Sequence, residues 1–244
     1  MRKIVITGAA SGIGKAATLA CVKAGYYVIA ADIDRLGLQM LQRSLPPHRL
    51  ETHLADFSQA HVYQSFISNL YDVHNHRALY ALVNNAWSSH GKSVCADSDS
   101  AVEESWAVKL KSLLYLSKDF ARRESAGGYS RSIVNITSVT GEVGSMDARY
   151  GATRAGVIGL TKANAWNFAP RVRVNAVSPA LVRNTSIHDR IPGQRRRGYE
   201  RQKIIEEPTQ PGGVADVILF LLSEQSRHLT GKVIAVDNGA CPRQ

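Results

Sequence analysis

The chain has 244 residues, of which 44% are hydrophobic and 20% are charged, and these values suit one globular α/β domain with a sizeable core. The net charge of +10 raises the question of a polyanionic partner, but the basic residues are dispersed apart from Arg195-Arg196-Arg197 and carry no interleaved aromatics, so we expect no nucleic-acid partner. No apolar run approaches the roughly 20 residues that span a bilayer, so we also expect no membrane partner.

Cysteines and histidines give no sign of disulfides or of a metal site. Cys21, Cys95 and Cys241 are scattered and lack CxxC spacing. The histidines form no pair at metal-ligand spacing next to a carboxylate. We therefore expect a cytoplasmic protein without a metal ion.

Short apolar runs typical of strands alternate with helical patterns along the whole chain. The runs cover residues 3–7, 26–31, 50–55, 79–83, 132–136, 173–177 and 233–236. This alternation predicts an α/β fold with a doubly wound parallel sheet of seven strands and helices on both faces. Because no linker-like stretch interrupts it, we expect a single domain over 1–244. Residues 181–210 show no clear hydrophobic period, so we expect a long loop there, of the kind that is usually either functional or disordered.

The first strand runs into a glycine-rich turn, Thr-Gly-Ala-Ala-Ser-Gly-Ile-Gly at 7–14, and then into a helical pattern at 15–24. Glycines allow a tight turn, and they let the backbone approach a pyrophosphate at the helix N-terminus. In this setting the turn predicts dinucleotide binding rather than a merely structural turn. The expected cofactor contacts in it are Gly8, Ser11, Gly12, Ile13 and Gly14.

Carboxylates follow the next two strands. Asp32 ends the second strand, where a carboxylate accepts hydrogen bonds from the ribose hydroxyls and repels a 2′-phosphate. This favours NAD over NADP, although Lys15 and Arg35 could soften the repulsion and NADP stays possible. Asp56 and Phe57 are placed to cover the adenine, and Asp56 also suits a helix N-cap.

Polar residues also follow the fourth and fifth strands. Asn84-Asn85-Ala86 can close a strand end beside a cofactor. Ser138 comes two residues after the run at 132–136, at the end of a parallel strand where α/β folds bind ligands. Tyr150 and Arg154 stand four residues apart in a helical pattern, so they share a face, and the positive charge favours phenolate over phenol. Taken alone, this pair suits surface packing better than an active site.

Together these motifs resemble the short-chain dehydrogenase/reductase family over essentially the full length of the chain. The resemblance is carried by residues 7–14, 84–86, 133–138, 150–154, 175–179 (Asn-Ala-Val-Ser-Pro) and 236–239 (Val-Asp-Asn-Gly). It implies a Rossmann-like fold, NAD(P)-dependent oxidoreduction of an alcohol or ketone, and a homo-oligomer, either a dimer or a tetramer.

The resemblance also implies roles for particular residues. Tyr150 would be the acid-base residue, and Ser138 would hydrogen-bond the substrate oxygen. Arg154 would hold the cofactor ribose together with Tyr150, and the backbone near Pro179 and Val182 would hold the carboxamide. The segment at 181–210 would form a substrate lid.

The chain departs from the family pattern at several positions. Arg154 replaces the catalytic lysine, and Lys109 replaces the catalytic asparagine. Trp87, Ala180 and Asn238 replace family glycines. Arginine keeps the positive charge but does not pass a proton, so the family's proton relay is in question.

Lys109 offers a possible compensation for this loss. Two cations about 4 Å apart repel by on the order of 4 kcal/mol at an effective dielectric of 20, which would make the Lys109 amine easier to deprotonate. Lys109 would then serve as a relay.

Three functions remain open at this point. The first is NAD(H)-dependent oxidoreduction of an alcohol or ketone. The second is a catalytically weakened paralogue with a regulatory or scaffold role. The third is a 3-oxoacyl-carrier-protein reductase that docks an acidic carrier on its basic surface, although Asp32 argues mildly against it. The sequence names neither the substrate nor the reaction direction.

Overall fold

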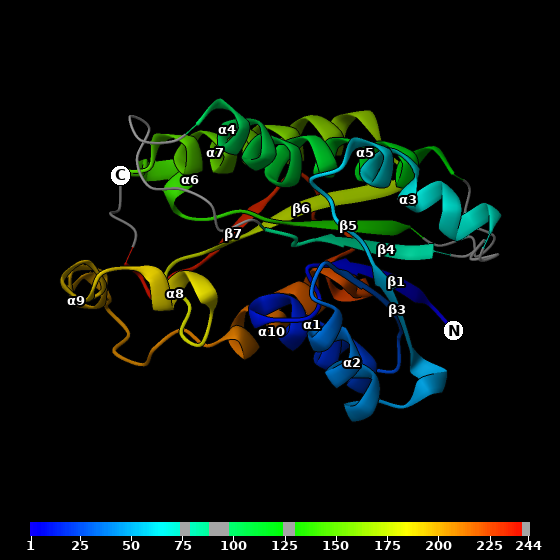
Figure 1. Ribbon diagram of the computed structural model, residues 1–244, viewed down its shortest axis with the longest axis horizontal. Coiled ribbons are helices and arrows are strands. Elements are labelled where there is room, and N and C mark those ends of the chain that lie inside the picture. The colour runs from blue at the N-terminus through cyan, green and yellow to red at the C-terminus, as the bar shows by residue number, and fades with distance from the viewer. Residues whose placement is uncertain (74–78, 88–97, 124–129, 241–244) are drawn as a thin grey trace.

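A parallel sheet of seven strands forms the centre of the protein, as the computed structural model shows for residues 1–73, 79–87, 98–123 and 130–240 (Figure 1). The strands are β1 (Lys3–Thr7), β2 (Tyr27–Asp32), β3 (Leu50–Leu54), β4 (Leu79–Asn84), β5 (Arg131–Ile136), β6 (Val172–Pro179) and β7 (Val233–Val236). Their order, β3-β2-β1-β4-β5-β6-β7, confirms the predicted doubly wound parallel sheet. Each predicted run overlaps one strand, and the ends of the run and of the strand differ by at most two residues.

Helices cover both faces of this sheet (Figure 1). Helices α1 (Gly12–Lys23), α2 (Arg35–Ser44) and α10 (Pro211–Leu222) pack on one face, and α3 (Ala60–Asp72), α5 (Ser112–Arg122) and α7 (Ala148–Asn167) pack on the other. The remaining elements are α4 (Asp99–Trp106), α6 (Thr140–Val143), α8 (Ser186–Arg190), α9 (Gly193–Gln202), the 3-10 turns Pro47–Arg49 and Glu224–Ser226, and a π-helical segment, Ala107–Lys111.

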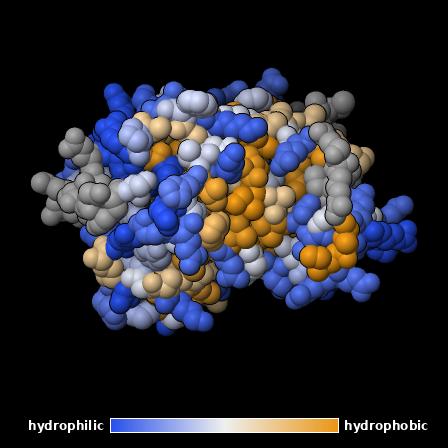
Figure 2. Space-filling view, turned by 180° about the vertical axis from the view of Figure 1, so that it is seen from behind, coloured by the Kyte–Doolittle hydropathy of each residue, from blue (hydrophilic) through white to orange (hydrophobic). Residues whose placement is uncertain are grey.

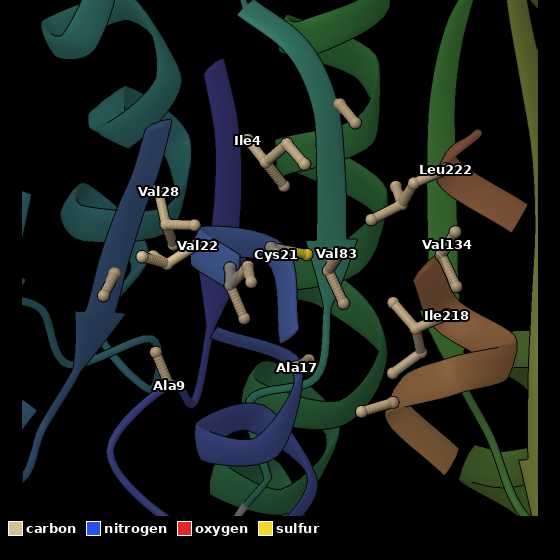
Figure 3. Packing of buried hydrophobic residues seen from close by; sticks show 14 of the residues in the cluster. Ile4, Ala9, Ala17, Cys21, Val22, Val28, Val83, Val134, Ile218 and Leu222 are labelled. Atoms are coloured by element: carbon tan, nitrogen blue, oxygen red, sulfur yellow. The ribbon is translucent and has the colours of Figure 1, made fainter. Parts of the chain in front are cut away.

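The alternating faces of the strands supply two hydrophobic layers. Ile4 of β1 packs toward α1 and α10, whereas its neighbour Val5 packs toward the opposite helices. Figure 3 shows the first layer, in which Cys21 of α1 lies beside Val83 of β4, with Ile218 and Leu222 of α10 on the far side of Val83. Burial raises the pKa of the Cys21 thiol to about 12, so this thiol is a packing group. Cys95 and Cys241 lie outside the described residues.

The expectation of a long loop at 181–210 was wrong, because this segment contains the two short helices α8 and α9. Helix α8 begins after Thr185, whose hydroxyl accepts the backbone N–H of His188 at 3.3 Å. Helix α9 has the sequence Gly-Gln-Arg-Arg-Arg-Gly-Tyr-Glu-Arg-Gln, with no apolar stripe. The hydrophobic period that signals a helix is therefore missing from this sequence.

The helical stretch before β5 is built from three consecutive parts. The helix begins at Asp99, with the Ser98 hydroxyl accepting the N–H of Ala101 at 3.3 Å. It then passes through the π-helical segment Ala107–Lys111 before continuing as α5. Such π-turns often occur at functional sites.

Across the four described ranges, no helix combines the length and apolar character needed to cross a membrane.

Candidate active site

A cleft of ≈ 720 Å³ lies at the carboxyl ends of the strands. It is lined by residues that follow successive strands: Gly8 after β1, Asp32 at the end of β2, Asn85 after β4, Ser138 after β5 and Ala180 after β6. Helices α8 and α9 lie beyond this end of the sheet (Figure 1) and contribute to its wall. This is the edge at which α/β folds bind ligands.

The glycine-rich turn has the close packing that the sequence predicts. Gly8 adopts φ +65°, and a Cβ there would lie 2.8 Å from the Ala86 Cα. A Cβ on Gly14 would lie 1.9 Å from the Gly8 carbonyl oxygen, so Gly14 packs directly against the backbone of the turn. Gly14 is not part of the cleft lining. Ser11, Gly12 and Ile13 do line it.

Two features of this turn fit a cofactor phosphate. The Ser11 side chain makes no capping hydrogen bond within the described part of the chain, which leaves the first-turn N–H groups of α1 for a ligand. The Asn85 amide donates to the Thr7 and Gly8 carbonyl oxygens at 3.0 and 2.9 Å, which holds the turn in shape.

Asp32 is held by the backbone on both sides. Its Oδ2 accepts the N–H of Ala10 at 2.8 Å, and its Oδ1 accepts the N–H of Asp34 at 2.9 Å. The carboxylate lines the cleft with Asp56, whereas Lys15 and Arg35 do not contribute to the described lining. This end of the cleft is therefore acidic.

Asp56 and Phe57 lie beside Asp32 in the wall of the cleft. The Asp56 Oδ1 accepts the N–H of Ser58 at 2.9 Å, which is a local turn, and α3 begins later, after Gln59. Phe57 is 3% exposed and meets Phe66 edge-on, at 5.3 Å between ring centroids.

Asn84 lies outside the cleft lining, unlike Asn85 and Ala86. Its amide donates to Asn135 Oδ1 at 2.8 Å and to Ser117 Oγ at 3.1 Å, in the layer between the sheet and α5. The predicted cofactor contact through this side chain is therefore replaced by a buried bridge between β4, β5 and α5.

Tyr150 and Arg154 lie side by side, as their spacing predicts. Tyr150 is in the first turn of α7, where its N–H donates to Asp147 Oδ1 at 2.9 Å. The Arg154 guanidinium carbon is 5.0 Å from the Tyr150 ring centroid, and its Nη1 donates to the Ile136 carbonyl oxygen at 3.0 Å. The Arg154 Nε is buried and has no hydrogen-bond partner among the described residues.

Ser138 faces the same cleft from the end of β5. Its Oγ accepts a hydrogen bond from Thr140 Oγ1 at 3.0 Å and lies 3.3 Å from the Thr140 backbone nitrogen. With its lone pairs occupied in this way, the Ser138 hydroxyl proton is left to donate into the cleft. Sequence reasoning missed Thr140, because nothing in the local sequence marks it.

Lys109 enters the site from the π-helical segment. It is 2% exposed, and its Nζ donates to Ser105 Oγ at 2.8 Å. The same Nζ lies 5.7 Å from the Tyr150 ring centroid and 5.6 Å from that of Trp87. Trp87 in turn meets Tyr150 edge-on, with centroids 6.5 Å apart and an interplanar angle of 89°.

Pro179 and Val182 also line the cleft, together with residues from α8 and α9. The Val182 carbonyl oxygen accepts the Thr185 hydroxyl at 2.8 Å. Arg190 and Tyr199 also line the cleft. Sequence reasoning did not select them, because the sequence of this segment shows no hydrophobic period.

The comparisons with known proteins agree with this architecture. The family model described as enoyl-(acyl carrier protein) reductase matches residues 8–241. A 3-oxoacyl-[acyl-carrier-protein] reductase of Thermotoga maritima is 32% identical, with 96% of each chain covered. A 2-keto-3-deoxy-L-fuconate dehydrogenase of Xanthomonas campestris is 30% identical, covering 98% of this chain and 79% of the relative.

Solved structures match over almost the whole chain as well. A short-chain dehydrogenase/reductase of Brucella melitensis, described as a glucose/ribitol dehydrogenase, superposes with a TM-score of 0.90 at 28% identity, covering 99% of this chain and 97% of that one. A 4-hydroxyisoleucine dehydrogenase complexed with NADH gives a TM-score of 0.89 at 26% identity, with all of both chains covered. The chain belongs to the short-chain dehydrogenase/reductase family. Its relatives are dehydrogenases and reductases, which makes it an oxidoreductase of the NAD(P)-using kind.

Proposed function

We propose that the protein is an NAD(H)-dependent oxidoreductase that interconverts an alcohol and a ketone on a small or medium-sized organic substrate. One observation carries this proposal: Ser138, Tyr150 and Arg154 line the same cleft as the glycine-rich turn and Asp32. Groups for proton transfer and groups for dinucleotide binding thus share one cavity.

Tyr150 is the proposed acid-base residue. When bound, a nicotinamide cofactor supplies or accepts the hydride. In the direction of reduction, Tyr150 gives its phenolic proton to the carbonyl oxygen, and in oxidation it takes the proton back. Ser138 donates a hydrogen bond to the same oxygen, where negative charge develops, and Thr140 orients the Ser138 hydroxyl.

Arg154 holds the cofactor ribose and keeps the potential around Tyr150 positive. Its fixed position between the Ile136 carbonyl and the Tyr150 ring, in the lining of the cleft, suits both tasks. Because a guanidinium stays charged in proteins, Arg154 does not carry the proton onward.

Lys109 is the proposed proton relay. Its Nζ lies over the Tyr150 ring and donates to the Ser105 hydroxyl, which places an amine beside the proposed acid-base residue. An amine releases and accepts protons, which the arginine at 154 does not.

Asp32 and Asp56 favour NAD over NADP in this proposal. A 2′-phosphate would meet two carboxylates in a stretch of lining where the described residues contribute no cation. The ribose hydroxyls of NAD, in contrast, would donate to the remaining lone pairs of Asp32.

A catalytically weakened paralogue is the second candidate. The observation that favours it is the edge-on contact of Trp87 with Tyr150, which places a large ring against the proposed acid-base residue. Restoring the family residues in a double variant, Lys109→Asn with Arg154→Lys, would then create activity that the parent lacks.

A carrier-protein reductase is the third candidate. The Thermotoga maritima relative carries that name, and α9, which contributes Tyr199 to the cleft lining, is rich in arginine in its sequence. Faster turnover of a carrier-linked 3-oxoacyl substrate than of its free thioester would favour this candidate over the first.

The test is a panel of alcohols and ketones offered with NAD⁺ or NADH, followed by absorbance. We expect turnover in the parent, a loss of roughly 100-fold or more in kcat for Tyr150→Phe, and a comparable loss for Ser138→Ala. NADH binding, measured by calorimetry, should survive both changes. Tight NADH binding without hydride transfer to any member of the panel would contradict the proposal.

A further inference from the structure

The lid segment, residues 181–210, is closed at its base by a hydrogen bond within the segment, from the Arg183 N–H to the Thr209 carbonyl oxygen at 2.9 Å. A second set of contacts ties the lid to the body of the protein. These contacts join the residues just after α9 to the turn that follows β7, and their hydrogen bonds are made by Asn238.

Asn238 makes three hydrogen bonds to the lid. Its carbonyl oxygen accepts the N–H groups of Ile204 and Ile205 at 2.9 and 3.1 Å. Its side-chain amide donates to the Glu207 carbonyl oxygen. The neighbouring Gly239 packs so closely that a Cβ there would lie 2.9 Å from Ile204 Cδ1.

The backbone of Asn238 explains why an asparagine suits this position. Asn238 adopts φ 55°, a conformation that glycine and asparagine tolerate and that most other residues avoid. Glycine would keep this conformation but would lose the amide donor. Asparagine supplies both the backbone shape and the third hydrogen bond.

The anchored residues connect directly to the wall of the cleft. Helix α9 ends at Gln202, and Ile204 follows two residues later. Tyr199, in the last turns of α9, lines the cleft. Fixing Ile204 and Ile205 therefore fixes the end of the helix that carries Tyr199.

We propose that Asn238 is a positioning residue that holds α9, and with it Tyr199, against the cleft, and so strengthens substrate binding without touching substrate. This inference rests on the proposed function, because it takes the cleft to be the place where substrate is bound and the lid to cover it. Loss of the Asn238 amide loosens the lid while the groups that move the proton stay in place.

The test uses the full chain and two independent measurements. The first is limited trypsin digestion without ligand, because the α9 sequence contains four cleavage sites: Arg195, Arg196, Arg197 and Arg201. In Asn238→Gly, we expect cleavage within α9 to be about fivefold faster, which corresponds to the loss of one hydrogen bond from a locally opening unit. The second measurement is steady-state kinetics, where KM should rise by a similar factor while kcat changes by less than about twofold.

Asn184→Gly is the matched control. Asn184 also has a positive φ, 56°, and stands in the lid, but its amide reaches only the exposed Gln210 side chain in the described structure, at 3.2 Å. The same change of residue type there should leave cleavage within α9 near the parent rate. Equal cleavage of Asn238→Gly and the parent, or equal acceleration in both variants, would overturn the proposal.

Asn238→Asp is the second variant, for the case that Asn238→Gly unfolds globally. Aspartate tolerates the positive φ but offers an acceptor where the Glu207 carbonyl needs a donor. Faster cleavage confined to α9 supports the inference, and unchanged cleavage refutes it. If the parent turns over no substrate, the proposed function fails, while the digestion still decides whether Asn238 anchors the lid.

Discussion

At the scale of single residues, the site is organised around Tyr150, which contacts three unusual neighbours. The Tyr150 ring centroid lies 5.0 Å from the Arg154 guanidinium carbon, 5.7 Å from the Lys109 Nζ and 6.5 Å from the Trp87 ring centroid. Two of these neighbours are cations, and the third is an aromatic ring that also faces Lys109. The tyrosine therefore stands in a positive and mostly buried environment.

Lys109→Met tests whether the amine relays protons. We expect kcat to fall by roughly tenfold or more, within the range of general acid-base contributions, and the pH profile of kcat to change shape because the relay group is gone. Steady-state rates from acidic to alkaline pH provide the measurement. The matched control is Lys111→Met, since Lys111 is exposed and pairs with Glu103 at 2.8 Å. Unchanged turnover and an unchanged pH profile would exclude Lys109 from the relay.

Asp32→Ala tests the cofactor preference. Removing the carboxylate should weaken NADH binding, since the ribose hydroxyls lose an ionised acceptor, by about 1.5 to 3 kcal/mol. It should also relieve repulsion of the 2′-phosphate, so the ratio of NADPH to NADH affinity should rise. Calorimetric titration of both cofactors decides this. A parent that prefers NADPH would show that Asp32 does not set the preference.

The residue types of the site could be read from the sequence, but their contacts could not. The spacing of Tyr150 and Arg154 was sufficient to predict a shared helix face. The direction of the Asn84 side chain was not predictable, because a residue at a strand end can turn toward either layer. Lys109 was found only through resemblance, since periodicity does not reveal a π-turn.

At the scale of elements, two buried arginines connect strand beginnings to helix ends. Arg131, the first residue of β5, donates to the Phe120 and Ala121 carbonyl oxygens at the end of α5, at 2.8 and 3.2 Å. Arg173 in β6 donates to the carbonyl oxygens of Leu221 and Ser226 near the end of α10, at 3.1 and 3.0 Å. Burial lowers the pKa of both arginines. Each guanidinium occupies the negative end of a helix dipole.

Arg173→Met should destabilise the fold strongly. Methionine keeps much of the apolar stem but leaves several helix-end carbonyl groups buried without a donor, so the free energy of unfolding should fall by about 3 kcal/mol or more. Urea unfolding followed by circular dichroism gives the value. Arg171→Met, at an exposed position just before β6, is the control and should change stability by less than about 0.5 kcal/mol. An equal fall in the free energy of unfolding in the two variants would contradict the proposed structural role of Arg173.

The elements themselves were largely predictable, and the exceptions have physical reasons. The predicted run at 132–136 stopped short of Arg131, because a charged residue usually marks the end of a buried strand. Its burial depends on the distant end of α5, which local sequence does not reveal. Helix α9 was missed for the opposite reason, since its sequence carries no apolar face to read.

At the scale of the whole molecule, apolar side chains remain exposed on the outer helices. Trp166 of α7 is 87% exposed, and Leu114 of α5 is 43% exposed. On the face opposite to that of Figure 1, Figure 2 shows a hydrophobic area among hydrophilic surroundings, without showing which residues form it. Because exposed apolar surface commonly marks association sites, a dimer or tetramer remains our prediction.

Trp166→Lys tests this association. If α7 forms the contact, the dissociation constant of the oligomer should rise by at least about thirtyfold, the factor that matches a hot-spot loss of about 2 kcal/mol. Sedimentation velocity over a concentration series measures it. Met40→Lys, at a 59% exposed position on α2 in the opposite layer, is the control. A parent that stays monomeric at every concentration would refute the expected oligomer.

The position of Trp87 has a practical consequence for studying this protein. The chain contains three tryptophans, and Trp87 lines the cleft with its indole nitrogen buried, whereas Trp166 stands in solvent. Reduced nicotinamide absorbs light in the region where indole emits, so a cofactor in the cleft should quench Trp87 emission by energy transfer. Soluble quenchers added to the solvent should reach Trp166 first. The protein thus carries an intrinsic fluorescent reporter of cleft occupancy, which requires no label and no turnover.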